Sequence, residues 1–241
     1  MASTVIKNWD NKTWLSSQKY INSFNNFLLK NIKLNSNSKI LDVGCGRGKI
    51  LGNLSSRLKL KDKPLGIDIV NHKDKERRIN FKKMNALKFF STNKEKFDLI
   101  LIKQTIHLLN FYQIKKILDL SKRNLSNRGK IFIFTLDVSK NEIPTFKLMK
   151  SKLKISLNRD KKIIKMITRI YPQRIKKRFS FKVRIIKKRY LNMIKNRYIS
   201  TLLSLSDNDL SEGLKEIDLK YKKTINFKDK LICMILKNSF K

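Results

Sequence analysis

The stretch Ile-Leu-Asp-Val-Gly-Cys-Gly-Arg-Gly at residues 40–48 decides how this 241-residue chain is expected to fold. Four residues that suit a short buried strand run directly into glycines at alternate positions, Gly44, Gly46 and Gly48. Glycine lets the backbone turn tightly and, without a Cβ atom, lets a ligand approach closely. In open α/β sheets, ligands bind beyond the carboxyl ends of the strands. The stretch therefore predicts a strand, a ligand-binding loop and a following helix.

Strands and helices alternate on both sides of this loop. The spacing of apolar residues predicts helices at 11–33 and 111–125. Apolar runs predict strands at 39–43, 64–69, 78–84, 97–102 and 130–136. Such alternation gives right-handed βαβ units, and so an α/β fold with a mainly parallel sheet and helices on both faces.

The pattern changes after Asp137. Residues 138–205 are basic and predict a helical insertion, which Pro172 divides into two halves. Ser206 predicts the N-cap of a short helix that ends near Gly213. The final runs, 217–225 and 230–237, predict a terminal antiparallel strand pair, which brings the sheet to seven strands. Three units are expected: a ligand-binding core at 1–137, the insertion at 138–205 and a part that completes the core at 206–241.

The glycine spacing favours one class of nucleotide site over another. Glycines at i, i+2 and i+4 differ from the G-x-G-x-x-G pattern of nicotinamide and flavin sites. Asp-x-Gly-Cys-Gly-x-Gly after an apolar strand resembles the first motif of the class I S-adenosylmethionine-dependent methyltransferases, in particular small-molecule, type 11-like members. The resemblance covers roughly residues 38–137 and implies a Rossmann-like fold. In that family such insertions cover the substrate, so it also implies that 138–205 acts as a lid.

Further motifs match this family in the right order. Asp68 ends the second strand, 26 residues past Asp42, where the family places an acid that receives the ribose hydroxyls. Asn85-Ala86 follows the third strand, where the family has Asp-Ala or similar beside the adenine. Residues 106–109 and 128–130 resemble the segments that follow the fourth strand and precede the fifth. Asn85 in place of an acid is a departure, as is Lys103-Gln104, where small or polar residues are commoner.

The resemblance implies S-adenosyl-L-methionine as cofactor and a set of residues around it. Asp42 is expected near the ammonium of its methionine part, and Cys45 is expected to be simply a small residue between glycines. The predicted cofactor-binding residues are Asp42, Gly44, Cys45, Gly46, Gly48, Asp68, Ile69, Asn85, Ala86 and Lys103.

On the substrate side we predict Gln104 and His107. His107 is either a general base, since the free pKa of histidine lies near 6.5, or a histidine packed beneath the cofactor. Residues 197–200 resemble a segment found after the cap in some small-molecule methyltransferases. Methyl transfer from a sulfonium needs neither a metal nor a protein nucleophile, so no metal site and no catalytic residue are assigned.

The basic excess is concentrated in one region. The chain carries 57 Lys and Arg against 18 Asp and Glu, and residues 150–197 alone hold 19 basic side chains and one acidic one. Three interpretations are open: a solvated cap, a surface for an acidic small molecule or an anionic membrane, and an RNA-binding surface. The hypothesis we favour is a methyltransferase for a small molecule, with an acidic one among the candidates. The alternatives are an RNA methyltransferase that uses 150–197 and a non-catalytic binding protein with the same fold.

Other features favour a cytoplasmic protein. Cys45 and Cys233 lie far apart without metal-ligand spacing, so two free thiols are expected. No run of about 18 apolar residues predicts a transmembrane helix. Residues 1–10 lack the apolar block of a secretion signal.

Overall fold

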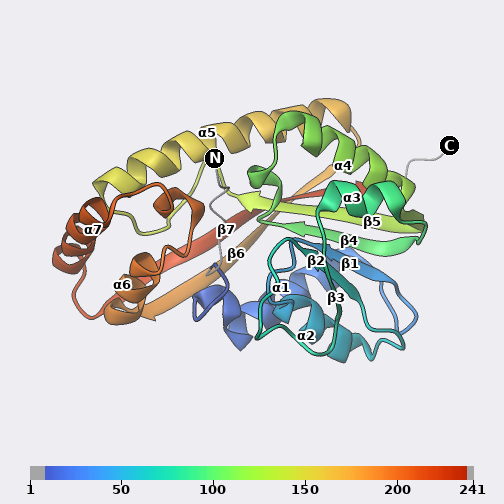
Figure 1. The fold of residues 1–241 in the computed structure, drawn as a ribbon, viewed down its shortest axis with the longest axis horizontal. Coiled ribbons are helices and arrows are strands. Elements are labelled where there is room, and N and C mark those ends of the chain that lie inside the picture. Colours follow the sequence, from blue (N-terminus) through green and yellow to red (C-terminus); the bar gives the residue numbers. More distant parts are fainter. Residues whose placement is uncertain (1–8, 238–241) are drawn as a thin grey trace.

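Short apolar segments build a seven-stranded sheet, which Figure 1 shows in the computed structural model; the structure describes residues 9–237. The strands are β1 (Ile40–Val43), β2 (Leu65–Asp68), β3 (Asn80–Lys83), β4 (Phe97–Lys103), β5 (Leu125–Leu136), β6 (Ile175–Ile186) and β7 (Thr224–Lys237). Their order is β3-β2-β1-β4-β5-β7-β6. The first five strands pair in parallel, whereas β7 is antiparallel to β5 and β6. The predicted mainly parallel, Rossmann-like sheet is confirmed, as is an antiparallel pair at its end.

Alternate residues of the central strands belong to two hydrophobic cores on opposite faces of the sheet. Leu101 on β4 packs with α1 (Gln18–Asn31) and α2 (Lys49–Leu58), whereas Ile102 packs with α3 (Ala86–Thr92) and α4 (Phe111–Arg123). The long helix α5 (Lys147–Ile170) contributes residues to both cores. Figure 1 shows it running from α7 (Asp207–Lys220) to α4, while α6 (Lys187–Lys195) packs against α7. Within residues 9–237 there are also three short 3-10 helices: η1 (Trp14–Ser16), η2 (Ile106–Leu108) and η3 (Ser200–Leu202).

The prediction that 138–205 is wholly helical is wrong, because β6 is an edge strand of the sheet. Within β6, Phe179, Val183 and Ile185 are buried, while the residues between them are mostly exposed and basic. This period of two is that of a half-buried strand. The helical interpretation relied on Ile186 as a core position, yet that side chain is 67% exposed.

The predicted C-terminal pair is also wrong in its details. Helix α7 begins after the predicted cap, Ser206, but continues through Gly213 to Lys220. A Cβ atom on Gly213 would lie 2.5 Å from the ring of Phe146, so glycine here allows close packing rather than ending the helix. The two predicted runs are replaced by the end of α7 and one continuous strand, β7, whose antiparallel partner at the edge is β6. The polar residues expected to form a turn instead alternate along β7, with Asp229 facing inward.

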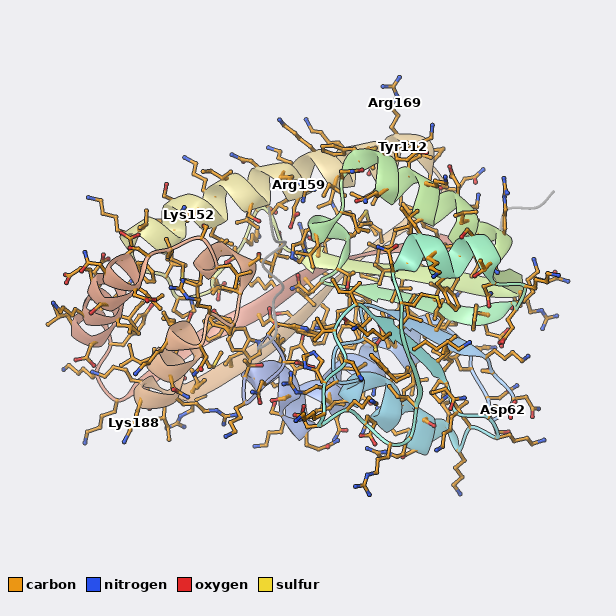
Figure 2. All side chains as sticks on the ribbon, in the orientation of Figure 1. Asp62, Tyr112, Lys152, Arg159, Arg169 and Lys188 are labelled. Carbon is orange, nitrogen blue, oxygen red and sulfur yellow. The ribbon has the colours of Figure 1, made fainter. Side chains whose placement is uncertain are left out.

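Most basic side chains of 150–197 lie on the outer surface. Figure 2 shows Arg169 on α5 and Lys188 on α6 extending away from the molecule. On β6, alternate Lys and Arg residues line the exposed face of an edge strand, where charge discourages pairing with another chain. Among the helices of the described chain, none is both long and apolar enough to cross a membrane.

The prediction that residues 1–10 do not form a secretion signal concerns mainly residues 1–8. These residues lie outside the part of the chain that the structure describes, as do residues 238–241 of the predicted C-terminal unit.

Candidate functional site

The glycine loop is held at the carboxyl ends of three strands. Gly44 and Gly46 have φ angles of +74° and +55°, which residues other than glycine rarely adopt. A Cβ atom on Gly44 would lie 2.1 Å from Oγ1 of Thr105, at the end of β4. The N–H of Gly44 donates to the carbonyl of Ile67 on β2 (2.8 Å), and the Thr105 hydroxyl donates to the carbonyl of Val43 on β1 (3.1 Å). Gly48 closes the loop as the residue before α2.

Asp68 lies beside this loop at the end of β2. Its carboxylate accepts hydrogen bonds from the N–H groups of Gly46 (2.8 Å) and Val70 (2.9 Å). Asn85 caps α3, since its side-chain oxygen accepts a hydrogen bond from the N–H of Leu87 (2.8 Å). This capping role suits asparagine as well as aspartate and gives a physical reason for the departure at this position.

Asp42 and Lys103 face a small crevice on the other side of the loop. Cys45 lines the same crevice, which has a volume of about 20 Å³. Asp42 Oδ1 and Lys103 Nζ are buried and have no hydrogen-bond partner among residues 9–237. Burial raises the pKa of Asp42 to about 7, with the Lys103 charge opposing and the Asp68 charge adding to the effect. Burial lowers the pKa of Lys103, while Asp229, Asp42 and Asp10 oppose it.

Two residues next to this crevice lie outside the motifs. The ring of Trp9 lies over Lys103 Nζ, with 5.1 Å to the ring centroid, and it packs against Gly46. Asp10 accepts a hydrogen bond from the N–H of Arg47 (2.9 Å) and pairs with its guanidinium (2.5 Å). Periodicity could not reveal either contact, because both residues precede the first helix.

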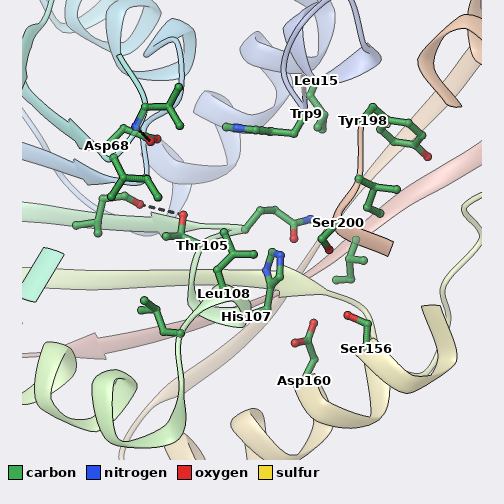
Figure 3. Close-up of a pocket in the computed structure, with 18 of the residues that line it drawn as sticks. Trp9, Leu15, Asp68, Thr105, His107, Leu108, Ser156, Asp160, Tyr198 and Ser200 are labelled. Atoms are coloured by element: carbon green, nitrogen blue, oxygen red, sulfur yellow. Dashed lines mark hydrogen bonds between the residues drawn. The ribbon is translucent and has the colours of Figure 1, made fainter. Parts of the chain in front are cut away.

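A larger cavity, of about 430 Å³, runs past Gly44 and Asp68. Ile69, Asn85 and Ala86 line it together with Asp68. Most of the predicted cofactor residues thus line this cavity or the small crevice, whereas Gly46 and Gly48 line neither. Figure 3 shows Asp68 at one side of the cavity and Asp160, on α5, at the other. His107 lies between them in this view.

The predicted substrate-side residues both line the cavity. Gln104 has a φ angle of +55°, and its N–H donates to the carbonyl of Phe134 (2.9 Å). His107 Nδ1 has no hydrogen-bond partner in the described chain. Burial lowers the pKa of His107 to about 4, and the positive charge of Arg159 adds to this shift. The imidazole is therefore neutral at neutral pH.

The far end of the cavity comes from regions beyond the motif-bearing core. Residues 198–201 line it. Asp160 and Asp229 also line it, and both are nearly fully buried, at 4% and 1% exposed. Neither acid was predicted, because α5 and β7 bring them to the site from beyond the last motif of the core, residues 128–130.

Both cysteines are buried free thiols, as expected. Burial raises the pKa of Cys45 and of Cys233 well above the ordinary thiol value, so both stay protonated. In the described part of the chain, no group of three His, Cys, Asp or Glu side chains is arranged to hold a metal ion.

Comparison with known proteins identifies the family. A family model described as "Methyltransferase domain" matches residues 34–196. No curated protein sequence matches the chain.

Several solved structures share the fold. The plantazolicin methyltransferase BpumL, in complex with a pentazolic desmethylPZN analog and SAH, is 20% identical, with a TM-score of 0.53; the match covers 96% of this chain and 88% of that one. A protein from the antibiotic biosynthesis pathway of Anabaena variabilis, described as a methyltransferase, is 15% identical, with a TM-score of 0.60, covering 88% and 96%. Another, from Bacillus halodurans, is 13% identical, with a TM-score of 0.55, covering 90% and 100%. At these identities the likenesses concern the fold.

The family match spans more than half of the chain, and its glycine loop and strand-end acid lie where the motifs predict. The protein therefore belongs to the methyltransferase domain family, among the class I S-adenosylmethionine-dependent methyltransferases.

Proposed function

We propose that this methyltransferase binds S-adenosylmethionine at the glycine loop and methylates a small molecule held at the far end of the cavity. One observation carries the proposal: a single cavity of about 430 Å³ is lined at one end by Asp68, Asn85 and Ala86 and at the other by α5 and residues 198–201. This volume lies in the range of small-molecule sites. The BpumL structure, which holds SAH together with a pentazolic desmethylPZN analog, supports a site that takes a nucleoside and a second molecule.

The residues of this chain fit the nucleoside end of the cofactor. Asp68 faces the cavity, and a carboxylate can accept two charge-assisted hydrogen bonds from ribose hydroxyls. Ile69 and Ala86 offer apolar surface for the adenine, with Asn85 beside them. The glycine loop leaves its backbone open to close approach.

The charges at the crevice match those of the amino-acid end. Methionine carries an ammonium and a carboxylate, which match the unpartnered acceptor Asp42 Oδ1 and the unpartnered donor Lys103 Nζ. A buried polar atom without a partner costs about 1–3 kcal/mol, so a ligand that satisfies both atoms recovers this free energy.

The acceptor end provides orientation and a hydrogen-bond acceptor. When bound, S-adenosylmethionine supplies an activated methyl group that passes directly to a nucleophile. Holding an acceptor in line with that group can lower the barrier by about 7–11 kcal/mol. His107 is neutral at neutral pH, so it can accept a hydrogen bond from the acceptor, while its low pKa makes it a weak base.

The basic segment does not add support for an RNA substrate. The aromatic residues that could stack on bases have other partners: Phe179 and Tyr190 are buried, and the Tyr171 hydroxyl donates to Asp119. The concentration of charge on the outside of α5 and β6 fits a solvated surface.

Calorimetry with S-adenosylhomocysteine tests the proposal. The wild-type protein and the exposed control Asp62→Ala should bind this nucleoside with similar affinity. Asp68→Ala and Gly46→Val should abolish binding while the far-ultraviolet circular dichroism stays that of a folded protein. Unchanged affinity in both variants contradicts the proposed cofactor site.

A further inference from the structure

The charges around the cavity are the reverse of those on the chain as a whole. The chain has a net charge of +39, yet no Lys or Arg of the described residues lines the large cavity. Three aspartates do line it: Asp68, Asp160 and Asp229. The formal charges that line the large cavity are therefore negative, whereas the buried Lys103 lies at the small crevice.

Asp160 is the acid at the acceptor end with an unused oxygen. Its Oδ2 accepts a hydrogen bond from the Thr135 hydroxyl (2.8 Å), whereas its Oδ1 is buried and has no partner in the described structure. The side chain comes from α5, one turn after Ser156, and Figure 3 shows its carboxylate pointing toward the cavity and His107. Burial raises the pKa of Asp160, which reflects the cost of keeping this charge away from water and from a counter-ion.

Of the two basic residues that flank Asp160 in the sequence, Lys161 is exposed and Arg159 has other partners. The Arg159 guanidinium donates to the backbone carbonyls of His107 and Leu109 and so ties η2 to α5. It lowers the pKa of Asp160 only through space, without a hydrogen bond to it. His107 itself is neutral at neutral pH. A positive charge on a ligand would therefore complete the set of partners around Asp160.

Asp229 is better satisfied. Its Oδ2 accepts a hydrogen bond from the indole N–H of Trp14 (3.1 Å), and the Lys103 charge acts on it. Asp229 is therefore already stabilised by a hydrogen bond and by a nearby positive charge. Asp160 is the acid that remains available to an acceptor.

The acceptor end combines apolar walls with the polar residues Ser156, Ser200 and Thr201. Leu108, Leu136, Ile143, Leu153 and Ile199 line the cavity. An acceptor that fits these walls has an apolar body as well as a polar head.

From this arrangement we propose that the acceptor carries a protonated nitrogen group, an amine or a guanidine, which the Asp160 carboxylate binds while an apolar body lies against the leucine and isoleucine walls. The inference rests on the proposed function, because it assigns the substrate class of the same site. A cationic acceptor replaces the acidic small molecule that the sequence analysis included among the candidate substrates. Asp160 acts here as a specificity-determining residue.

A matched set of probes tests the inference. 2-Phenylethylamine, 2-phenylethanol and phenylacetate share an apolar body and differ in the charge of the head, and benzylguanidine adds the second cationic type. Binding of each to the protein saturated with S-adenosylhomocysteine is measured by ligand-observed NMR titration. Saturation with the nucleoside is verified first by calorimetry, so a failure of the cofactor site is seen before any probe is added.

A cationic probe should bind at least tenfold more tightly than the alcohol or the carboxylate. Asp160→Asn should remove at least tenfold of this affinity and leave the alcohol unchanged, because the amide keeps the bond to Thr135 and loses only the charge. The exposed variant Asp62→Asn, which makes the same change in net charge, should behave as wild type. The inference is overturned if phenylacetate binds best, if no cationic probe is preferred, or if Asp160→Asn retains the preference. The wild-type comparison needs no variant, so it decides the matter even if Asp160→Asn does not fold.

Discussion

Asp42 on β1 and Lys103 on β4 line the same crevice beside the glycine loop, and each buries one polar atom without a hydrogen-bond partner in residues 9–237. One atom is an acceptor and the other a donor, so together they complement the ammonium and carboxylate of an amino acid. Each also shifts the pKa of the other in the direction that favours its charged form.

Lys103→Met should distinguish binding of the amino-acid end of the cofactor from binding of its nucleoside end. Methionine keeps much of the length and apolar contact of lysine but removes the charge that we propose binds the carboxylate. S-adenosylhomocysteine should bind at least tenfold more weakly to this variant, because charge-assisted hydrogen bonds contribute about 1.5–3 kcal/mol. 5′-Methylthioadenosine, which lacks the amino-acid end, should bind within twofold of wild type. Equal calorimetric losses for the two nucleosides would show that Lys103 only supports the fold of the site.

Asp42→Asn should change how stability depends on pH. The pKa of Asp42 is raised from 3.8 to about 7, so the native state holds a proton that the unfolded state has already lost. The stabilisation associated with this group is therefore present below about pH 3.8 and disappears as pH rises through about 7. At pH 8, Asp42→Asn should be more stable than wild type by up to about 4 kcal/mol, and the difference should shrink toward pH 4.

Urea unfolding of both proteins at several pH values measures this difference. A difference that is independent of pH contradicts the account of Asp42. The affinity of wild type for S-adenosylhomocysteine should also rise between pH 6 and pH 7.5, because the ammonium of the ligand favours the ionised carboxylate. Asp42→Asn should lack this rise.

Asp10→Ala should destabilise the protein, because Asp10 binds Arg47 in the glycine loop. Asp10 and Arg47 pair with side-chain exposures of only 8% and 7%, and removal of one member of a buried pair costs about 3–5 kcal/mol. Asp74 also pairs with Arg47 but is 60% exposed, so Asp74→Ala should cost less than about 1 kcal/mol. Comparison of the two variants by urea unfolding tests whether the burial of the pair decides its effect. Similar losses in both would argue that it does not.

The parallel half of the fold could be predicted because its information is local. Strands at 39–43 and 97–102 are short apolar runs, and the glycine loop follows the first of them directly. Each of the predicted cofactor residues lies at the end of a strand or between that end and the first turn of the next helix, and the topology places these strand ends at one edge of the sheet.

The second half was harder to predict for physical reasons. In β6 the apolar residues also fall at intervals that suit a helix. The exposure of Ile186 in the structure shows that the period of two of a strand applies instead. In β7 a buried Asp229 interrupts the apolar run, and its partner Trp14 lies 215 residues away. Asp160 looks in the sequence like a lone acid in a basic helix, and only the packing of α5 on the sheet turns it toward the cavity.

A crystal structure of the protein with S-adenosylhomocysteine tests the central claim most directly. The account predicts ribose hydroxyls within hydrogen-bond distance of Asp68, and the amino-acid end between Asp42 and Lys103. A nucleoside bound elsewhere, or an amino-acid end that contacts neither of these two residues, would contradict it.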